Sequence, residues 1–466
     1  MTLTTANTDR AVADLQPRFR GEIVTPDHPA YDAVRRVWNG SIDRYPALIA
    51  RCTGTADVIA AVRFAREHDL LVAVRGGGHS IPGFSTCDGG LLIDLQPMKG
   101  IAVDPVAREA VAEPGLTWGE LDRETQAFGL ATPGGEVSDT GIAGLTLGGG
   151  IGWLRRLHGL TCDNLLSVDL VTADARLVHA SADENTDLFW GVRGGGGNFG
   201  IVTSFRYRLH IVGPFVGGMV MHPIERGPEV LRFYRQLASA APDEITLMAA
   251  IITAPPAPFV PEDLRGRPAV VLGAAHFGSS QAGASALAEL GGFGPPAVNA
   301  IRPMGYVELQ RLVDEATPRG MQTYVKSEML TGLTDDVIDA VVRAGRAPSS
   351  PMNQILLPQL GGAMSRVPRD ETAFVHRQAA FMATIASMWS SPQEADAPHL
   401  AWARDLWDAM RTVSTGGAYV NHLGREGDAR LRQSYGEATY TRLAALKKAW
   451  DPDNFFRLNQ NIAPAK

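Results

Sequence analysis

Three observations predict that the sequence folds as an α+β protein with two domains. Helical and strand patterns alternate over roughly the first 212 residues. From about Pro214 the segments lengthen and are joined by proline-rich stretches such as 254–258, which indicates a second domain. A chain of 466 residues is long enough for two or three units, each with its own core.

Local patterns predict the elements of the first half. Apolar residues recur at helical spacing over 55–68, behind a threonine that can cap the helix. The Thr-Trp-Gly-Glu sequence at 117–120 is a capping box that opens a helix to about Phe128. Short β-rich runs predict strands at 71–74, 91–95, 109–112, 168–173 and 201–209.

In the second half, helices and strands are expected to alternate up to Ala363. A helical stretch is then predicted through Trp389, and another at 399–411. Leucine and tyrosine residues at helical intervals predict a last helix at 429–450, which stops at the Asp-Pro-Asp-Asn sequence of 451–454.

Composition and charge exclude several classes of protein. The net charge of −7 gives no electrostatic surface for nucleic acid, and 45% apolar with 20% charged residues is typical of globular proteins. The three cysteines form no CxxC pair, and neither His158 nor His276 has a spaced partner, so we expect no disulfide framework and no metal. No signal-peptide or membrane-spanning segment is recognisable, so we expect a cytoplasmic protein without membrane partners.

Glycine, at 50 residues, is concentrated in runs at 76–78, 148–150 and 194–197. A glycine-rich turn after a strand lets an anion approach the backbone N–H groups closely, because no Cβ blocks it. The pyrophosphate of a dinucleotide is the ligand expected at such a turn. Residues 195–200 satisfy the GxGxxG pattern, but a β-patterned segment follows them where a nicotinamide-binding fold needs a helix. A Rossmann fold is therefore not expected.

His79 lies at the edge of the first glycine loop, between three glycines and a serine. An isolated histidine there is most simply a turn residue with its hydrogen bonds satisfied. Next to a bound cofactor, an imidazole can instead serve as a ligand, a base or a covalent anchor.

Five ordered blocks spread over the chain resemble one family. They are RGGGHS at 75–80, TGIAGLTLGGGIGW at 140–153, HGLTCDNL at 158–165, DLFWGVRGGGGNFGIV at 187–202, and a C-terminal signature from Tyr419-Val-Asn421 to 462. These blocks are similar to those of FAD-linked oxidases of the vanillyl-alcohol oxidase/p-cresol methylhydroxylase (PCMH) superfamily, specifically the berberine-bridge-enzyme-like branch.

The resemblance implies a PCMH-type FAD-binding fold. Residues 20–212 would form the FAD-binding domain, 213–411 a substrate domain of antiparallel sheet covered by helices, and 412–466 a segment returning to the FAD domain. His79 matches the histidine that the family links covalently to the flavin. The resemblance assigns cofactor binding to Arg75, Gly76, Gly77, Gly78, His79, Ser80, Gly134, Val137, Ser138, Thr140, Gly141, Gly144, Gly148, Gly149, Gly152, Trp153, Asn164, Gly200, Ile201, Val202, Tyr419, Asn421 and Asn459.

The sequence departs from the family at the second attachment point. Many members also link the flavin through a cysteine before the second glycine loop, and Val137 occupies that position here. A single link through His79 is therefore predicted. Cys162 lies beyond the loop and is interpreted as a core or near-flavin packing residue, and Cys52 and Cys87 are interpreted in the same way.

Three residues are candidates for catalysis. His422 occupies a slot where members often carry a tyrosine, and it could accept a substrate proton near neutral pH or only hydrogen-bond the cofactor or backbone. Tyr324 and Gln354 belong to stretches that line the open face of the flavin in relatives. Alternation places Gln354, Leu356 and Pro358 on one side of their strand.

The loop residues Val137, Thr140 and Leu145 resemble the oxygen-facing loop of bacterial secondary-metabolite tailoring members, such as the enterocin-pathway flavoprotein. That enzyme's pocket glutamate and tyrosine would fall at Leu356 and Ala250, so its reaction cannot be transferred. An oxygenating flavin species is one hypothesis that this loop leaves open.

The resemblance implies an FAD-dependent oxidase that takes hydride from a C–H next to a hydroxyl, amine or ring and passes electrons to O2. Small or apolar walls near Ala249, Ala250 and Leu356 favour an aromatic or polyketide-like secondary metabolite over a sugar. Two alternatives stay open: a flavoprotein that sequesters a drug or metabolite with little turnover, and a dehydrogenase with a non-oxygen acceptor.

Overall fold

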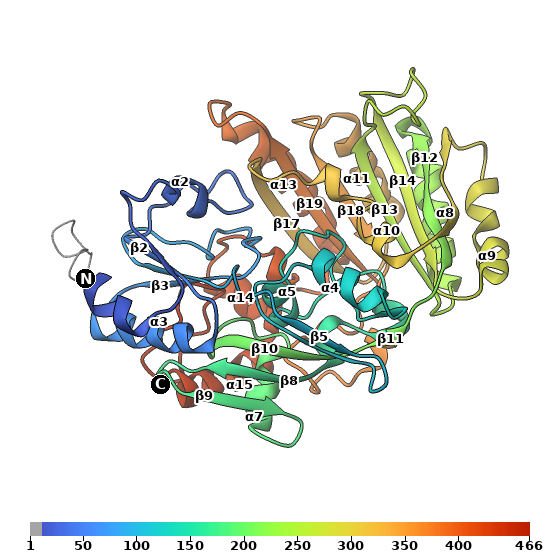
Figure 1. Cartoon of the computed structure of the whole chain (residues 1–466). Coiled ribbons are helices and arrows are strands. Elements are labelled where there is room, and N and C mark those ends of the chain that lie inside the picture. The colour runs from blue at the N-terminus through green and yellow to red at the C-terminus, as the bar shows by residue number, and fades with distance from the viewer. Residues whose placement is uncertain (1–11) are drawn as a thin grey trace.

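Four β-sheets and their covering helices make up the computed structural model, which describes residues 12–466 (Figure 1). The first sheet has the order β1-β2-β4-β3, with the strands Glu22–Val24, Leu48–Arg51, Leu91–Asp94 and Val72–Arg75 in that order. β4 pairs in parallel with β2 and β3, and helix α3 (Thr55–Glu67) packs its buried face into the same core. The first glycine loop follows directly from the end of β3.

The second sheet is antiparallel, with the order β5-β6-β10-β8-β9. Its strands are Ile101–Asp104, Glu109–Ala112, Ile201–Arg208, Leu165–Val171 and Leu177–Ser181. Helix α4 (Trp118–Gln126) begins with the predicted capping box, in which Thr117 and Glu120 satisfy each other's backbone N–H groups. Helix α7 (Thr186–Val192) and the C-terminal helix α15 (Glu437–Trp450) pack together beside this sheet.

The third sheet is the largest and is antiparallel throughout, with the order β15-β12-β14-β13-β18-β19-β17 and β16 paired to β12. In that order its strands are Val298–Asn299, Phe215–Pro223, Pro268–His276, Ile245–Thr253, Gln354–Pro358, Phe381–Trp389 and Gln322–Leu330, with Arg302–Met304 as β16. One face is covered by α8 (Gly227–Ala240), α9 (Ser280–Gly292), α11 (Asp335–Arg346) and α13 (Asp396–Met410) (Figure 1). Because side chains alternate along a strand, Leu356, Met382 and Thr384 lie on the other face of the sheet, which these helices do not cover.

The C-terminal segment returns to the second sheet. Tyr435, Leu443 and Ile462 are buried in one core with residues of that sheet and of α4. Lys447 is fully buried, and its Nζ donates to the Asp451 carboxylate at 2.6 Å and to two backbone carbonyls. This buried ion pair fixes the turn that ends α15.

The remaining elements are short. They are α2 (Tyr31–Val34), α5 (Ile142–Leu147), α6 (Arg155–His158), α10 (Tyr306–Gln310), α12 (Ala363–Arg366), α14 (Asp428–Tyr435), the strand pair β7 (Leu130–Ala131) and β11 (His210–Ile211), and six single-turn 3₁₀ helices (Gln16–Arg18, Thr161–Asn164, Ile224–Arg226, Asp314–Ala316, Arg411–Val413 and Val420–His422).

Two predictions about the second half were wrong. The helix expected up to Trp389 is instead strand β19, in which all nine residues are buried, and such an apolar run carries no period that distinguishes strand from helix. The single helix expected at 429–450 is broken at Gly436, which has a positive φ of 72° and separates α14 from α15. The predicted domain boundaries stay a prediction. Among the described residues, no helix combines the length and the hydrophobicity needed to cross a membrane.

Asp122 is a fully buried carboxyl on α4, held by a 2.9 Å hydrogen bond from Gln310 of α10. Burial raises its pKa from 3.8 to about 7, and the Gln310 hydrogen bond offsets only part of that. Between these two values the folded state keeps a proton that the unfolded state releases, so stability falls as pH rises through this window.

We expect Asp122→Asn to stabilise the protein by on the order of 2–4 kcal/mol at pH 8, because the amide keeps the Gln310 contact without a buried charge. Urea unfolding at pH 5 and pH 8 measures this, and the gain should shrink at the lower pH. Equal stability of the variant and the wild type at pH 8 would show that the buried, ionised Asp122 does not destabilise the folded protein.

Candidate active site

A cavity of about 420 Å³ lies where the first two sheets, the helix-free face of the third sheet and the C-terminal segment meet. Segments far apart in the sequence form its wall: the loop after β3, the loop entering α5, the start of β10, strands β17 to β19, and residues 419–422. Of the predicted site residues, the wall contains Gly76, Gly77, Gly78, His79, Ser80, Val137, Thr140, Gly141, Gly144, Gly200, Ile201, Val202, Gln354, Tyr419, Asn421, His422 and Asn459.

The glycine loop after β3 presents free backbone donors. Gly78 has a φ of +79°, which favours glycine. Within residues 12–466, the N–H groups of Gly77 to Ser80 donate to no protein acceptor. A Cβ on Gly77 would lie 2.3 Å from the backbone nitrogen of Gly141, so the two glycine loops approach this closely only because both positions lack side chains. Unpaired N–H groups in such a turn form an anion-binding concavity.

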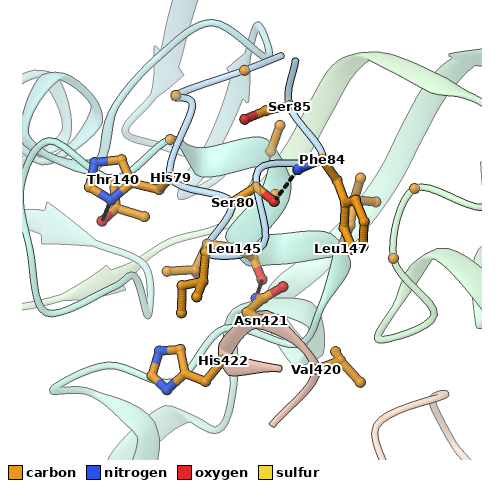
Figure 2. Close-up of a pocket in the computed structure, with 18 of the residues that line it drawn as sticks. His79, Ser80, Phe84, Ser85, Thr140, Leu145, Leu147, Val420, Asn421 and His422 are labelled. Carbon is orange, nitrogen blue, oxygen red and sulfur yellow. Dashed lines mark hydrogen bonds between the residues drawn. The ribbon is translucent and has the colours of Figure 1, made fainter. Parts of the chain in front are cut away.

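His79 is held on three sides at one end of the cavity, beside Thr140 (Figure 2). Its Nε2 lies 2.9 Å from Asp139 Oδ1, and its ring stacks on Trp38 with centroids 5.2 Å apart. Asp139 also accepts a 2.8 Å hydrogen bond from Arg319 Nε. Burial alone would raise the pKa of Asp139, but His79 and Arg319 outweigh it and hold that pKa below its usual value.

These contacts leave the other ring nitrogen of His79 comparatively free. Among the residues that the structure describes, Nδ1 has only a long, 3.5 Å contact, with Thr140 Oγ1. A carboxylate beside Nε2 favours the tautomer with the proton on that nitrogen, which leaves the lone pair on Nδ1. The arrangement can therefore supply a nucleophilic nitrogen to a group bound in the cavity.

The C-terminal segment places His422 and Asn421 in the wall on the far side of Leu145 from His79 (Figure 2). Thr384 Oγ1 lies 3.1 Å from His422 Nδ1, and no protein partner reaches Nε2 among the described residues. Burial lowers the pKa of His422 to about 4, so the ring is neutral at pH 7. A neutral imidazole with a free nitrogen is suited to accept a proton.

Tyr419 and Asn421 fix this segment to the second glycine run. Asn421 Nδ2 donates to Leu145 O at 3.1 Å and to Tyr419 Oη at 2.8 Å, and the Gly150 N–H donates to the same phenol oxygen at 3.0 Å. A Cβ on Gly148 would lie 2.1 Å from Asn421 Oδ1. Gly148 is thus needed for the return of the C-terminal segment, and it does not itself line the cavity.

Tyr324 was predicted as catalytic, and the structure places it elsewhere. It lies on the helix-covered face of β17, where its Oη accepts a 3.1 Å hydrogen bond from Arg404 of α13. Its neighbour Val325 lines the cavity instead. Gln354 does line the cavity, but its Nε2 already donates to Ala316 O at 2.5 Å, which indicates a positioning role. Of the small pocket walls expected at Ala249, Ala250 and Leu356, only Leu356 lies in the wall.

Eight residues predicted to bind the cofactor also lie outside the cavity wall. Three of them stabilise the surrounding structure: Arg75 forms an ion pair with Asp94 at 2.8 Å, Ser138 Oγ donates to Asp314 at 2.5 Å, and Trp153 packs in a separate core. These eight residues are Arg75, Gly134, Ser138, Gly148, Gly149, Gly152, Trp153 and Asn164. Cys162 packs in a buried cluster with Met329 and Tyr419, in keeping with the packing role expected of it.

Sequence reasoning missed many residues of the cavity wall, and four residues of the site matter most for its chemistry. Trp38, Glu136 and Thr384 line the cavity, and Asp139 contacts His79. Glu136 and Asp139 stand beside predicted residues of the same loop, and an acidic residue next to a glycine loop was the available signal. Trp38 and Thr384 reach the cavity only through tertiary packing.

Comparison with known proteins identifies the family. Residues 46–181 match the FAD binding domain model, and 418–463 match the model described as berberine and berberine like. The chain is 34% identical to an FAD-linked oxidoreductase of Dictyostelium discoideum, over 92% of each chain. The chain belongs to the berberine-bridge-enzyme-like family of FAD-linked oxidoreductases.

Other relatives share its full length. (R)-6-hydroxynicotine oxidase of Paenarthrobacter nicotinovorans is 31% identical, over 96% of this chain and 97% of the relative. The crystal structure of 6-hydroxy-D-nicotine oxidase from Arthrobacter nicotinovorans superposes with a TM-score of 0.85 at 29% identity, covering 96% and 98% of the two chains. BBE-like 1 of Physcomitrella patens superposes with a TM-score of 0.86 at 25% identity, covering 98% and 99%. The predicted α+β, PCMH-type fold and the prediction of an FAD-dependent oxidoreductase are confirmed.

The residues of the cavity fit FAD. The free N–H groups of the first glycine loop suit a pyrophosphate. Asn459 Oδ1, in the wall of the cavity, is buried without a protein donor in the described part of the chain. Apolar Val137, Leu145 and Ile201 provide surface for a flat ring system.

Proposed function

We propose that this protein is an oxidase that carries FAD on a single covalent link to His79 and oxidises a small aromatic or polyketide-like alcohol or amine. The observation that carries the proposal is the pair of half-buried histidines in one cavity: His79 lies against a carboxylate, and His422 is neutral with a nitrogen that has no partner among the described residues. FAD, when bound, supplies the hydride acceptor and the route of electrons to O2.

The protein's own residues attach the flavin, accept the substrate proton and exclude water. His79 Nδ1 is the nitrogen available for the link, and Val137, which cannot form one, occupies the position of the family's second attachment point. His422 Nε2 would take the proton of the substrate hydroxyl or amine, while Thr384 holds its Nδ1. Apolar residues of the sheet, Leu356, Met382 and Met388, exclude water from the reacting groups.

Anaerobic titration with aromatic alcohols and amines, followed by admission of air, tests the reaction. Bleaching of the flavin and rapid return of its colour in air are expected of an oxidase. Tight binding without bleaching would instead indicate a sequestering flavoprotein. Bleaching without rapid recovery would indicate a dehydrogenase that uses another acceptor.

Asp139 is expected to act through His79 as a positioning residue. Asp139→Asn removes the charge that holds the Nε2 proton, so Nδ1 becomes a poorer nucleophile and the link should form about tenfold more slowly or incompletely. The measurement is the fraction of acid-resistant flavin after apoprotein is incubated with FAD for increasing times. Arg319→Gln is the milder companion variant, since it leaves the carboxylate in place. Normal linkage kinetics in Asp139→Asn would contradict this role.

A further inference from the structure

Glu136 is the one carboxylate in the described wall of the cavity, and no lysine or arginine lies in that wall. It directly precedes Val137 in the loop that enters α5. Its side chain is mostly buried, with 16% of its surface exposed, and it lies in the cavity wall. The exposed part therefore faces the cavity.

Only one oxygen of this carboxylate has a protein partner. Arg155 Nη1 donates to Glu136 Oε1 at 2.9 Å, and no protein donor within residues 12–466 reaches Oε2. Burial raises the pKa of Glu136, and the attraction of Arg155 offsets only part of that effect. Oε2 is therefore open to the cavity, and a ligand that covers it must offer it a donor, because an acceptor left without one is costly.

Arg155 cannot turn to satisfy the second oxygen. Its side chain is fully buried, and its Nε donates to Gln359 O at 2.6 Å, with further bonds to Gly152 O and Leu247 O. Gln359 and Leu247 belong to the third sheet or its edge, so the ion pair lies where the glycine loops meet that sheet. Glu136 is thereby held at the sheet side of the cavity.

We infer that Glu136 is a specificity-determining residue that accepts a hydrogen bond from a hydroxyl group of an uncharged aromatic substrate. The charge of the carboxylate is balanced by Arg155, so the pair attracts a neutral donor and has no excess charge for a cation. At the sheet, Thr384 Oγ1 contacts His422, and the Gln354 amide nitrogen donates to Ala316 O. Glu136 is distinguished from these neutral groups by its charge, which makes it the stronger acceptor for a hydroxyl. This inference rests on the proposed function, because it assumes that the cavity beside the flavin site receives the substrate.

The test compares two probes that differ only in the donor, 2-naphthol and 2-methoxynaphthalene, titrated into the oxidised, FAD-loaded protein. Affinity is measured from the change in flavin absorption or by calorimetry, and needs no turnover. Wild type should bind 2-naphthol about ten- to a hundredfold more tightly. Equal affinities, or no binding of either probe, would overturn the inference.

The variant Glu136→Gln tests the role of the carboxylate directly. Its partner Arg155 can only donate hydrogen bonds, and this fixes the orientation of the new amide. The amide oxygen must face Arg155, which turns the NH₂ group into the cavity and replaces an acceptor by a donor. The affinity for 2-naphthol should fall at least tenfold, while that for 2-methoxynaphthalene should hold or rise. Glu124→Gln, an exposed site on α4, is the matched control and should bind as wild type does.

The outcomes separate this inference from the proposed function. A Glu136→Gln variant with normal FAD content, normal thermal unfolding and unchanged preference for 2-naphthol would overturn the role of Glu136 alone. A wild-type protein that takes up no FAD would overturn the proposed function. If the variant fails to fold, the comparison of the two probes on the wild type still tests the inference, because a cavity that shows no preference for the hydroxyl overturns it.

Discussion

His79→Ala should leave all FAD extractable by acid and should slow flavin reduction about tenfold or more. The nucleophilic Nδ1 is lost, so no bond to the flavin can form, and the tuning of its reduction potential by the link is lost with it. The glycine loop is retained, so FAD should still bind. Acid precipitation followed by absorption of pellet and supernatant measures the link, and stopped-flow reduction measures the rate.

His179→Ala is the matched control, because this histidine lies on β9 outside the cavity and its side chain is 42% exposed. It should keep its flavin in the pellet and reduce at the wild-type rate. Covalent flavin in His79→Ala would refute the assignment of the anchor.

His422→Gln should lower the rate of flavin reduction by about 10²–10⁴, the usual contribution of a general base, with FAD content unchanged. The amide can still meet Thr384 but cannot take the substrate proton. Since burial lowers the pKa of His422 to about 4, wild type should stay active down to roughly that pH and lose activity below it. The variant should lack this acidic limb.

Tyr324→Phe is the control for this prediction, because Tyr324 lies on the helix-covered face of the sheet, away from the cavity. It should reduce at the wild-type rate under the same conditions. A His422→Gln rate within threefold of wild type would assign His422 a purely structural role.

The glycine loops and His79 could be located from the sequence because their signals are local. A β-rich run ending in three glycines fixes a strand and the tight turn after it, and β3 and the loop occur where expected. The capping box at Thr117 likewise involves only neighbours in the chain.

Tyr324 shows what the sequence could not decide. A strand places alternate residues on opposite faces, and an error of one residue exchanges the two faces. Tyr324 and Val325 are both compatible with either face, and only the packing of α13 against β17 selects Val325 for the cavity. The local signal for Glu136, an acidic residue beside a glycine loop, does not reveal its partner: Arg155 is oriented in part by the Leu247 and Gln359 carbonyls, more than 90 residues away in the sequence.

The most direct test of the account is the intact-protein mass of the wild type after acid denaturation, measured together with the colour of the acid precipitate. We expect a yellow pellet and a mass increase of one FAD less two hydrogens, which disappears in His79→Ala. A colourless pellet with the unmodified mass, from a protein that binds FAD, would contradict the covalent link and leave His79 as a non-covalent contact.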